Sequence, residues 1–141
     1  MLELFVDDYF LALVSILALC VLYVIQIIVG DLAQDGAGHT PGRPFEGSHD
    51  QFAFRAIRAP ANSLENMPFM IFLIGLGIAL GASPAWLNGL ALLCVAARFV
   101  HMSAYYADKR YVRGYSWMFG VLLMTLLCGV DIWAVVTTVK S

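Results

Sequence analysis

The chain has 141 residues, of which 61% are hydrophobic and only 13% are charged, and its formal net charge is −2. A soluble domain of this length could not bury so much apolar surface, so the composition excludes an ordinary soluble enzyme and favours a small integral membrane protein. The basic residues form no long run, which argues against nucleic acid as a partner.

The first predicted element is a membrane span over residues 9–29. Its apolar run is interrupted only by Ser15 and Gln26, and about 20 such residues suffice to cross a bilayer. Asp7 and Asp8 stand where a signal peptide would carry positive charge, so we expect this span to be a retained anchor.

A long loop is predicted over residues 31–51, because this segment is rich in Gly and Pro. His39 and His49 lie in the loop, but no cluster of ligands accompanies them, so no metal site is predicted. From Asp50 to Ala59 the pattern indicates a helical extension of the next span outside the bilayer.

The second span is predicted over residues 62–81. The uncharged stretch from Met67 to Leu80 is too short to cross the membrane alone, and the turn sequence GASP ends the helix on its C-terminal side. The missing length must therefore come from the residues before Met67. Asn62, Glu65 and Asn66 therefore belong to the first turns of the spanning helix.

The third and fourth spans are predicted over residues 86–106 and 115–139. The third carries Arg98 and His101, and the fourth carries Asp131. The four spans together predict an all-α integral membrane four-helix bundle formed by a single domain, residues 1–141.

Some polar and thiol residues of the spans are expected to have structural roles. Asp131 lies far from the other charges, and either a hydrogen bond to Asn88 or a packing role fits it. Cys20, Cys94 and Cys128 lie inside apolar runs and are expected to be buried thiols that pack as small hydrophobes.

The distribution of Lys and Arg predicts the orientation in the membrane. The first and third loops hold six basic residues, whereas the opposite side holds only Lys140; the six are Arg43, Arg55, Arg58, Lys109, Arg110 and Arg113. The first and third loops are thus expected in the cytoplasm, with both termini on the opposite side.

A polar cluster is predicted at the cytoplasmic ends of the second and third spans. Arg98, His101 and Tyr105 are spaced i, i+3, i+7 and share one helix face, and the two spans are antiparallel neighbours because a short turn joins them. Glu65 and Arg98 then lie at one depth and are expected to form an ion pair. The pair could have a purely structural role and fix the two helices to each other.

The surroundings of this pair favour a binding pocket over a purely structural role. Asn62, His101 and Tyr105 join it, and Arg58, Arg110 and Arg113 crowd the same rim. Because Arg donors suit carboxylates, such a pocket would hold a small anionic molecule.

The two polar segments resemble the signatures of a known family. "RAPANSLENMP", from Arg58 to Pro68, resembles the R-A-x-x-N-x-x-E-x-x-P signature of the MAPEG superfamily (membrane-associated proteins in eicosanoid and glutathione metabolism). "ARFVHMSAY", from Ala97 to Tyr105, resembles its A-R-x-x-H/Y-x-x-x-Y signature. The resemblance covers the chain from Phe54 to the end of the fourth span and suggests a bacterial-type member.

The resemblance implies a homotrimer that binds glutathione as co-substrate between neighbouring subunits. It implies that five residues contact or frame the tripeptide: Arg58, Asn62, Glu65, His101 and Tyr105. It also implies that an Arg at the start of the fourth span is catalytic and stabilises the thiolate; Arg113 matches best and Arg110 is the second candidate.

The activity implied is that of a glutathione transferase or peroxidase acting on a lipophilic electrophile or hydroperoxide from the bilayer. The alternative is a non-enzymatic lipid- or partner-binding membrane protein of the same fold. The chain departs from relatives at three places: GDLAQD replaces a basic residue after the first span, Asn66 replaces a Tyr, and an aromatic near the sulfur is matched only by Tyr115 or Trp117.

Small residues of the second span predict where the trimer packs. Gly77 and Gly81 are spaced i, i+4, with Gly75 and Ala79 nearby, and small residues let membrane helices approach closely. The number three comes from the resemblance alone.

Overall fold

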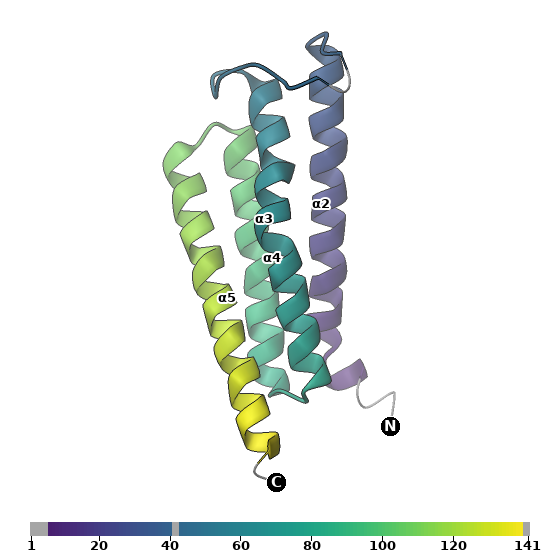
Figure 1. Ribbon diagram of the computed structural model, residues 1–141, viewed down its shortest axis with the longest axis vertical. Helices are drawn as coiled ribbons and strands as arrows, with labels where there is room; N and C mark the ends of the chain where they lie inside the picture. Colours follow the sequence, from purple (N-terminus) through teal and green to yellow (C-terminus); the bar gives the residue numbers. More distant parts are fainter. Residues whose placement is uncertain (1–5, 41–42, 140–141) are drawn as a thin grey trace.

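A computed structural model describes residues 6–40 and 43–139. It contains four long helices (Figure 1), and their bounds are α2 Phe10–Gly36, α3 Phe52–Ala79, α4 Pro84–Tyr106 and α5 Arg110–Val139. Each is long and apolar enough to span a membrane. The prediction of an all-helical integral membrane protein with four candidate spans is confirmed.

The outer surface of the bundle is apolar. Leu17, Phe69 and Trp133 are each more than 60% exposed in the protomer. A helix in a soluble protein would carry polar residues on its outer face. The exposed apolar faces therefore fit a bundle whose solvent is lipid or a neighbouring subunit.

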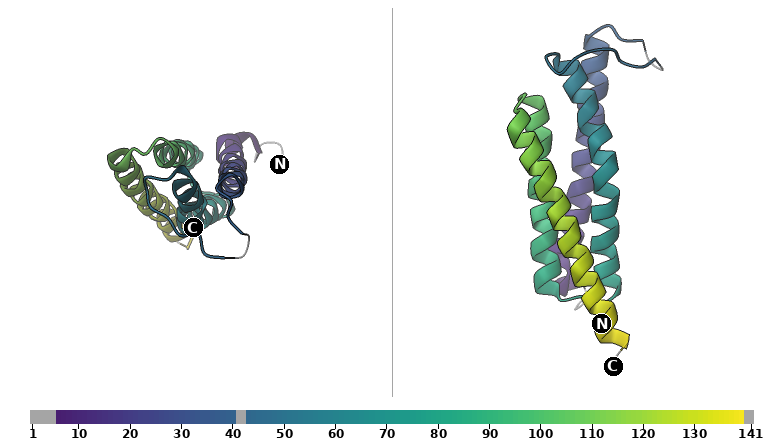
Figure 2. Two further views of the ribbon diagram at one scale, coloured as in Figure 1. Left: turned by 90° about the horizontal axis from the view of Figure 1, so that it is seen from above. Right: turned by 60° about the vertical axis from the view of Figure 1, so that its left-hand side comes forward.

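Helices α3 and α4 lie between the two outer helices, α2 and α5. α2 packs on α3 and α4, and α5 packs on the same two helices, as the view from above shows (Figure 2). The N- and C-terminal ends lie at one end of the bundle, and the loop before α3 lies at the other end together with the α4–α5 turn (Figure 1). This arrangement agrees with the predicted grouping of loops, while the side that faces the cytoplasm stays a prediction.

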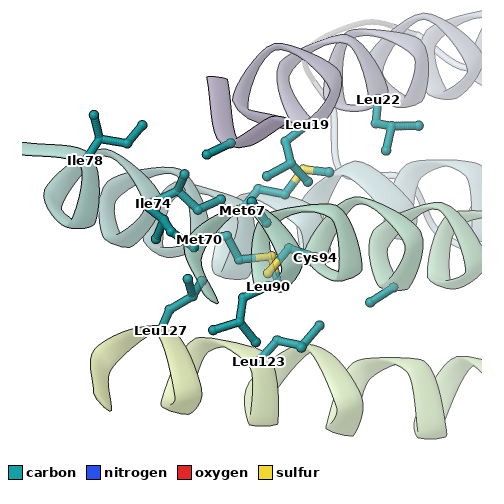
Figure 3. Close-up of a cluster of buried hydrophobic side chains, with 14 of the residues drawn as sticks. Leu19, Leu22, Met67, Met70, Ile74, Ile78, Leu90, Cys94, Leu123 and Leu127 are labelled. Atoms are coloured by element: carbon teal, nitrogen blue, oxygen red, sulfur yellow. The ribbon is translucent and has the colours of Figure 1, made fainter. Parts of the chain in front are cut away.

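One hydrophobic core runs along the middle of the bundle. Figure 3 shows side chains from all four helices meeting there, including Leu19, Met70, Cys94 and Leu127. These four side chains are completely buried. Burial of a Leu or Met side chain stabilises by about 1.5–3 kcal/mol in water, but in lipid close packing replaces that term.

The first helix is longer than predicted. α2 continues to Gly36, so residues 31–36 are helical and the loop begins only at residue 37. The helix ends where Gly38 adopts φ +69°. There the N–H of Gly38 donates to the carbonyl of Asp35 at 2.9 Å, and that of His39 donates to Gln34 at 3.1 Å. This is a glycine cap that closes the last turn.

The starts of α3 and α5 also differ from the predicted spans. α3 begins at Phe52, which agrees with a helical extension ahead of the second span. α5 begins at Arg110, ahead of the predicted residue 115. The hydrophobic pattern marks the part of a helix inside the membrane, whereas the helix itself continues for a turn or more into water.

The glycines of the second span are used inside the protomer. A Cβ at Gly77 would lie 2.7 Å from Oδ1 of Asp131 and 2.8 Å from Cδ1 of Leu87. Gly81 has φ +66° and ends α3. Contacts and backbone geometry inside the protomer thus account for these two residues, and the packing of a trimer through the second span stays a prediction.

Of the two roles considered for Asp131, the hydrogen bond to Asn88 is wrong. The amide of Asn88 accepts from the N–H of Ala12 and donates to the carbonyl of Asp8, both at 2.8 Å, and thereby holds the start of α2. Asp131 is buried and its carboxyl has no hydrogen-bond partner among the described residues. Its contact with Gly77 favours the packing alternative.

The three cysteines divide into two environments. Cys94 is buried, as predicted, but Cys20 and Cys128 are exposed on the protomer. An apolar run in a membrane helix does not distinguish an inner face from a lipid-facing one, because both are apolar.

Candidate functional site

A cavity of about 290 Å³ lies between α3, α4 and α5, at the end of the bundle that carries the loop before α3. Its lining is Asn62, His101, Tyr105, Arg110, Arg113, Gly114 and Trp117. The structure thus brings together residues from both signature segments and from the start of α5.

Arg113 is held over the cavity by two contacts. Its Cζ lies 4.7 Å from the centre of the Tyr105 ring, which is within the range of cation–π attraction. Its Nη1 lies 3.3 Å from Nδ1 of His49. Arg110 also lines the cavity, but it is exposed and its guanidinium lies over Tyr111, at 5.2 Å.

His101 presents an unpaired nitrogen in this region. Its Nδ1 lies 3.0 Å from the carbonyl oxygen of Arg113 and 3.1 Å from Oγ of Ser116. Because a carbonyl can only accept, Nδ1 carries the hydrogen and Nε2 is left as an acceptor. His101 is 2% exposed, and Nε2 has no partner among the described residues.

Behind the cavity, a hydrogen-bonded chain joins three helices. Nη2 of Arg98 donates to Oγ of Ser63 at 2.7 Å and to Oδ1 of Asn62 at 3.3 Å. Ser63 in turn donates to Oε1 of Gln26 at 2.6 Å. Arg98, Ser63 and Gln26 are all buried, so the chain fixes α4, α3 and α2 relative to one another.

The predicted ion pair between Glu65 and Arg98 is wrong for the protomer. Within the described residues no salt bridge joins them; Arg98 bonds to Ser63 and Asn62 instead. Glu65 is exposed and accepts only a long bond, 3.5 Å, from Nδ2 of Asn62. Glu65 is two positions after Ser63, which is about 200° around a helix, so the buried serine faces inward and the glutamate faces outward.

Two predicted ligand residues lie outside the cavity. Arg58 and Glu65 are exposed and do not line it. They are spaced i, i+7, with Asn62 between them, so all three belong to one stripe of α3. Only Asn62 reaches the cavity within the protomer.

Arg55 is a buried residue whose role the sequence did not indicate. Its Nε donates to the carbonyl of Tyr105 at 3.0 Å and its Nη1 donates to the carbonyl of His49. Nη1 also lies 3.8 Å from the carboxylate of Asp108. Arg55 therefore ties the start of α3 to the loop and to the α4–α5 turn. In the sequence it was counted only among the charges that set the orientation.

His49 is a second missed residue. His49 is exposed, but partial desolvation of its ring lowers its pKa, and the positive charges of Arg113 and Arg58 lower it further. Its ring packs edge-on against Phe54, with 5.1 Å between centroids. His49 lies in a loop rich in Gly and Pro, and nothing in that sequence pattern indicates its contact with Arg113.

Three further positions complete the comparison with the predicted site. Trp117 lines the cavity, whereas Tyr115 is 71% exposed and does not line it. Asn66 is buried and donates to the carbonyl of Asn62 at 3.0 Å. It supports the helix and does not line the cavity.

A larger cavity, of about 720 Å³, lies at the other end of the bundle between α4 and α5. It is lined by Trp86, Trp133 and ten other residues, none of them charged. It offers no positive charge that could stabilise an anion.

Comparison with known families agrees with the two signature segments. The sequence from residue 11 to residue 133 matches the family model described as the MAPEG family, and the match reaches into all four helices. No curated protein sequence matches the chain.

Proposed function

This chain belongs to the MAPEG family, which includes glutathione-dependent transferases and peroxidases, and from that premise we propose that it is a membrane-embedded, glutathione-dependent enzyme. Its substrate would be a lipophilic electrophile or hydroperoxide that reaches the site from the bilayer. The observation that carries the proposal is the cavity in which Arg113, His101, Tyr105 and Asn62 meet.

Arg113 would stabilise the thiolate of glutathione. A free thiol has a pKa of about 8.5 and is mostly protonated at neutral pH. A guanidinium stays charged under these conditions, and beside the sulfur it would favour the ionised form. The contacts with Tyr105 and His49 support this role, because a positioned charge stabilises an anion without reorganising.

Two reactions follow from one activated sulfur. In conjugation the thiolate forms a bond to an electrophilic carbon, the thiol proton passes to water, and the displaced electron pair leaves with the leaving group or is protonated. In peroxide reduction the sulfur attacks the O–O bond, giving an alcohol and a sulfenic acid. A second glutathione then reduces the sulfenic acid to the disulfide and water.

The other cavity residues would bind and orient the tripeptide. Nε2 of His101 has no hydrogen-bond partner among the described residues, and His101, Asn62 and Tyr105 all line the cavity. Arg58 and Glu65 lie outside the cavity of the protomer. We propose that they reach the ligand in a homotrimer whose site lies between subunits. Light scattering in mild detergent tests the trimer; a monomer would remove this part of the proposal.

The orientation proposed for the site is cytoplasmic. The end of the bundle that carries the cavity also carries every described Lys and Arg except Arg98, which is buried inside α4, and cytoplasmic loops are enriched in Lys and Arg. Labelling of a cysteine introduced at Glu46 or at Lys109 by an impermeant reagent, in cells and in opened membranes, tests the sidedness. Labelling in intact cells would place the cavity outside.

The thiol itself provides the direct test of function. Glutathione is titrated against pH with the purified protein in detergent, and the thiolate is followed by its ultraviolet absorbance. We expect the bound thiol to ionise at a lower pH than free glutathione. If bound glutathione ionises like the free tripeptide, the proposal fails.

The alternative is a lipid- or partner-binding membrane protein that keeps the cavity without activating a thiol. One observation favours it: Arg58 and Glu65, two of the five residues implied by the family signatures, do not line the cavity. Binding of glutathione without a change in thiol ionisation, or no binding, would support this alternative.

A further inference from the structure

We propose that His49 is a positioning residue for Arg113: its neutral imidazole accepts a hydrogen bond from the guanidinium and holds it over Tyr105, and protonation of the imidazole releases it. The link to catalysis rests on the proposed function. The contact itself can be tested without glutathione.

The chemistry of the two groups decides the direction of the hydrogen bond. A guanidinium has only donors, so the 3.3 Å contact between Nη1 of Arg113 and Nδ1 of His49 requires a lone pair on Nδ1. The ring hydrogen must then be on Nε2. A protonated ring has no lone pair to offer and would place one cation against another.

The backbone of His49 is held by Arg55, near the start of α3. Arg55 donates to the carbonyl of His49 and, at 3.0 Å, to the carbonyl of Tyr105. The ring of His49 also packs on Phe54. One buried arginine therefore fixes the end of the loop to the C-terminal end of α4, where Tyr105 receives Arg113.

The charges that face His49 favour its neutral form. Arg113, Arg58 and Arg55 are positive, and Asp108 is the one acidic group among the described residues that acts on the ring appreciably. Partial desolvation of the ring lowers the pKa of His49 most, followed by the charges of Arg113 and Arg58. At neutral pH the ring is therefore an acceptor, and the hydrogen bond is lost only as the pH falls through its lowered pKa.

This contact distinguishes Arg113 from Arg110. Without His49, the guanidinium of Arg113 would keep only its contact with the ring of Tyr105, which leaves it free to slide over the ring face. With His49 it has two anchors from different elements. A catalytic charge needs such fixation to act on a developing anion.

The first test is a titration of the histidine ring protons by NMR in detergent micelles, which is tractable because the chain has 3 histidines. The His49→Asn variant assigns the signal. We expect His49 to titrate below the ordinary value of about 6.5, and Arg113→Ala to move it upward. Arg110→Ala is the matched control and should leave it unchanged. Identical titrations in the parent and Arg113→Ala would overturn the contact.

The second test follows thiolate formation against pH in two variants of His49. Asn offers an uncharged acceptor near the position of Nδ1 and cannot be protonated there, whereas Ala offers none. We expect His49→Ala to lower the thiolate-forming equilibrium roughly tenfold, as for loss of one hydrogen bond to a charged group. We expect His49→Asn to retain it and to extend it to lower pH than the parent.

Equal behaviour of the Asn and Ala variants would overturn the positioning role, because a merely structural loop residue would not be rescued by an acceptor. If the parent forms no thiolate at any pH, the proposed function fails. The NMR titration still decides in that case whether His49 holds Arg113.

Discussion

Arg98 donates a hydrogen bond to Ser63, with 2.7 Å between Nη2 and Oγ, and both side chains are buried. A guanidinium inside a membrane bundle usually pairs with an acid, because an isolated charge is costly there. Here its described partners are the neutral oxygens of Ser63 and Asn62. The serine therefore occupies the place that the spacing of polar residues had assigned to Glu65.

Ser63→Ala should destabilise the protein more than Glu65→Gln. Removal of the serine hydroxyl takes away the partner of Oε1 of Gln26 and leaves Arg98 only its longer bond to Asn62, at a cost of about 1–3 kcal/mol. Glu65 is exposed, so its substitution should change stability by no more than about 0.5 kcal/mol. Unfolding by SDS from mild detergent measures both. A loss of ~3–5 kcal/mol in Glu65→Gln, as for a broken buried ion pair, would restore the ion-pair hypothesis.

Arg113→Ala should leave folding and glutathione affinity largely intact but reduce turnover with a model electrophile by on the order of 10²-fold, as for loss of one charge-stabilising donor. Arg110→Ala should lose much less, because its guanidinium lies over Tyr111 and lacks the anchors of Arg113. Steady-state kinetics of the two variants beside the parent check this. If the parent is active and Arg113→Ala is equally active, Arg113 does not stabilise the thiolate.

Gly114→Leu should block the cavity without disturbing the fold. Gly114 lines the cavity, and a Cβ added there meets no atom within 4 Å. We expect glutathione affinity to fall roughly tenfold or more, equivalent to about 1.4 kcal/mol. Gly129→Leu is the matched control: it lies in the same helix, has the same free space and lines the other cavity. Calorimetric titration that finds the same affinity for both variants would place the ligand elsewhere.

Gly77→Ala and Gly75→Ala should have effects of opposite sign on stability. A Cβ at Gly77 meets Asp131 and Leu87 at less than 3 Å, so overpacking should cost about 1–3 kcal/mol. At Gly75 no atom lies within 4 Å, and replacing a helical glycine gains up to ~1 kcal/mol. Thermal unfolding of both variants measures this. If Gly77→Ala is instead stable but its oligomeric state changes, Gly77 lies at a subunit interface.

The sequence alone determined the four membrane helices and the residues that could form a polar site. Hydrophobic runs of membrane length separated by charged loops leave few alternatives, because the backbone in lipid must satisfy its own hydrogen bonds. Two antiparallel spans joined by a short turn also place Asn62, His101 and Tyr105 at one depth. The meeting of these three side chains with Arg113 was predictable for that reason.

Only the tertiary structure decided which neighbours those residues have. Depth along a helix follows from counting residues, but direction around it depends on how the helices pack, and in lipid the inner and outer faces are both apolar. That is why Ser63 and not Glu65 meets Arg98, and why Cys94 is buried while Cys20 is exposed. The contact between His49 and Arg113 joins a loop to a helix 64 residues later, and no periodicity relates two such segments until the chain has folded.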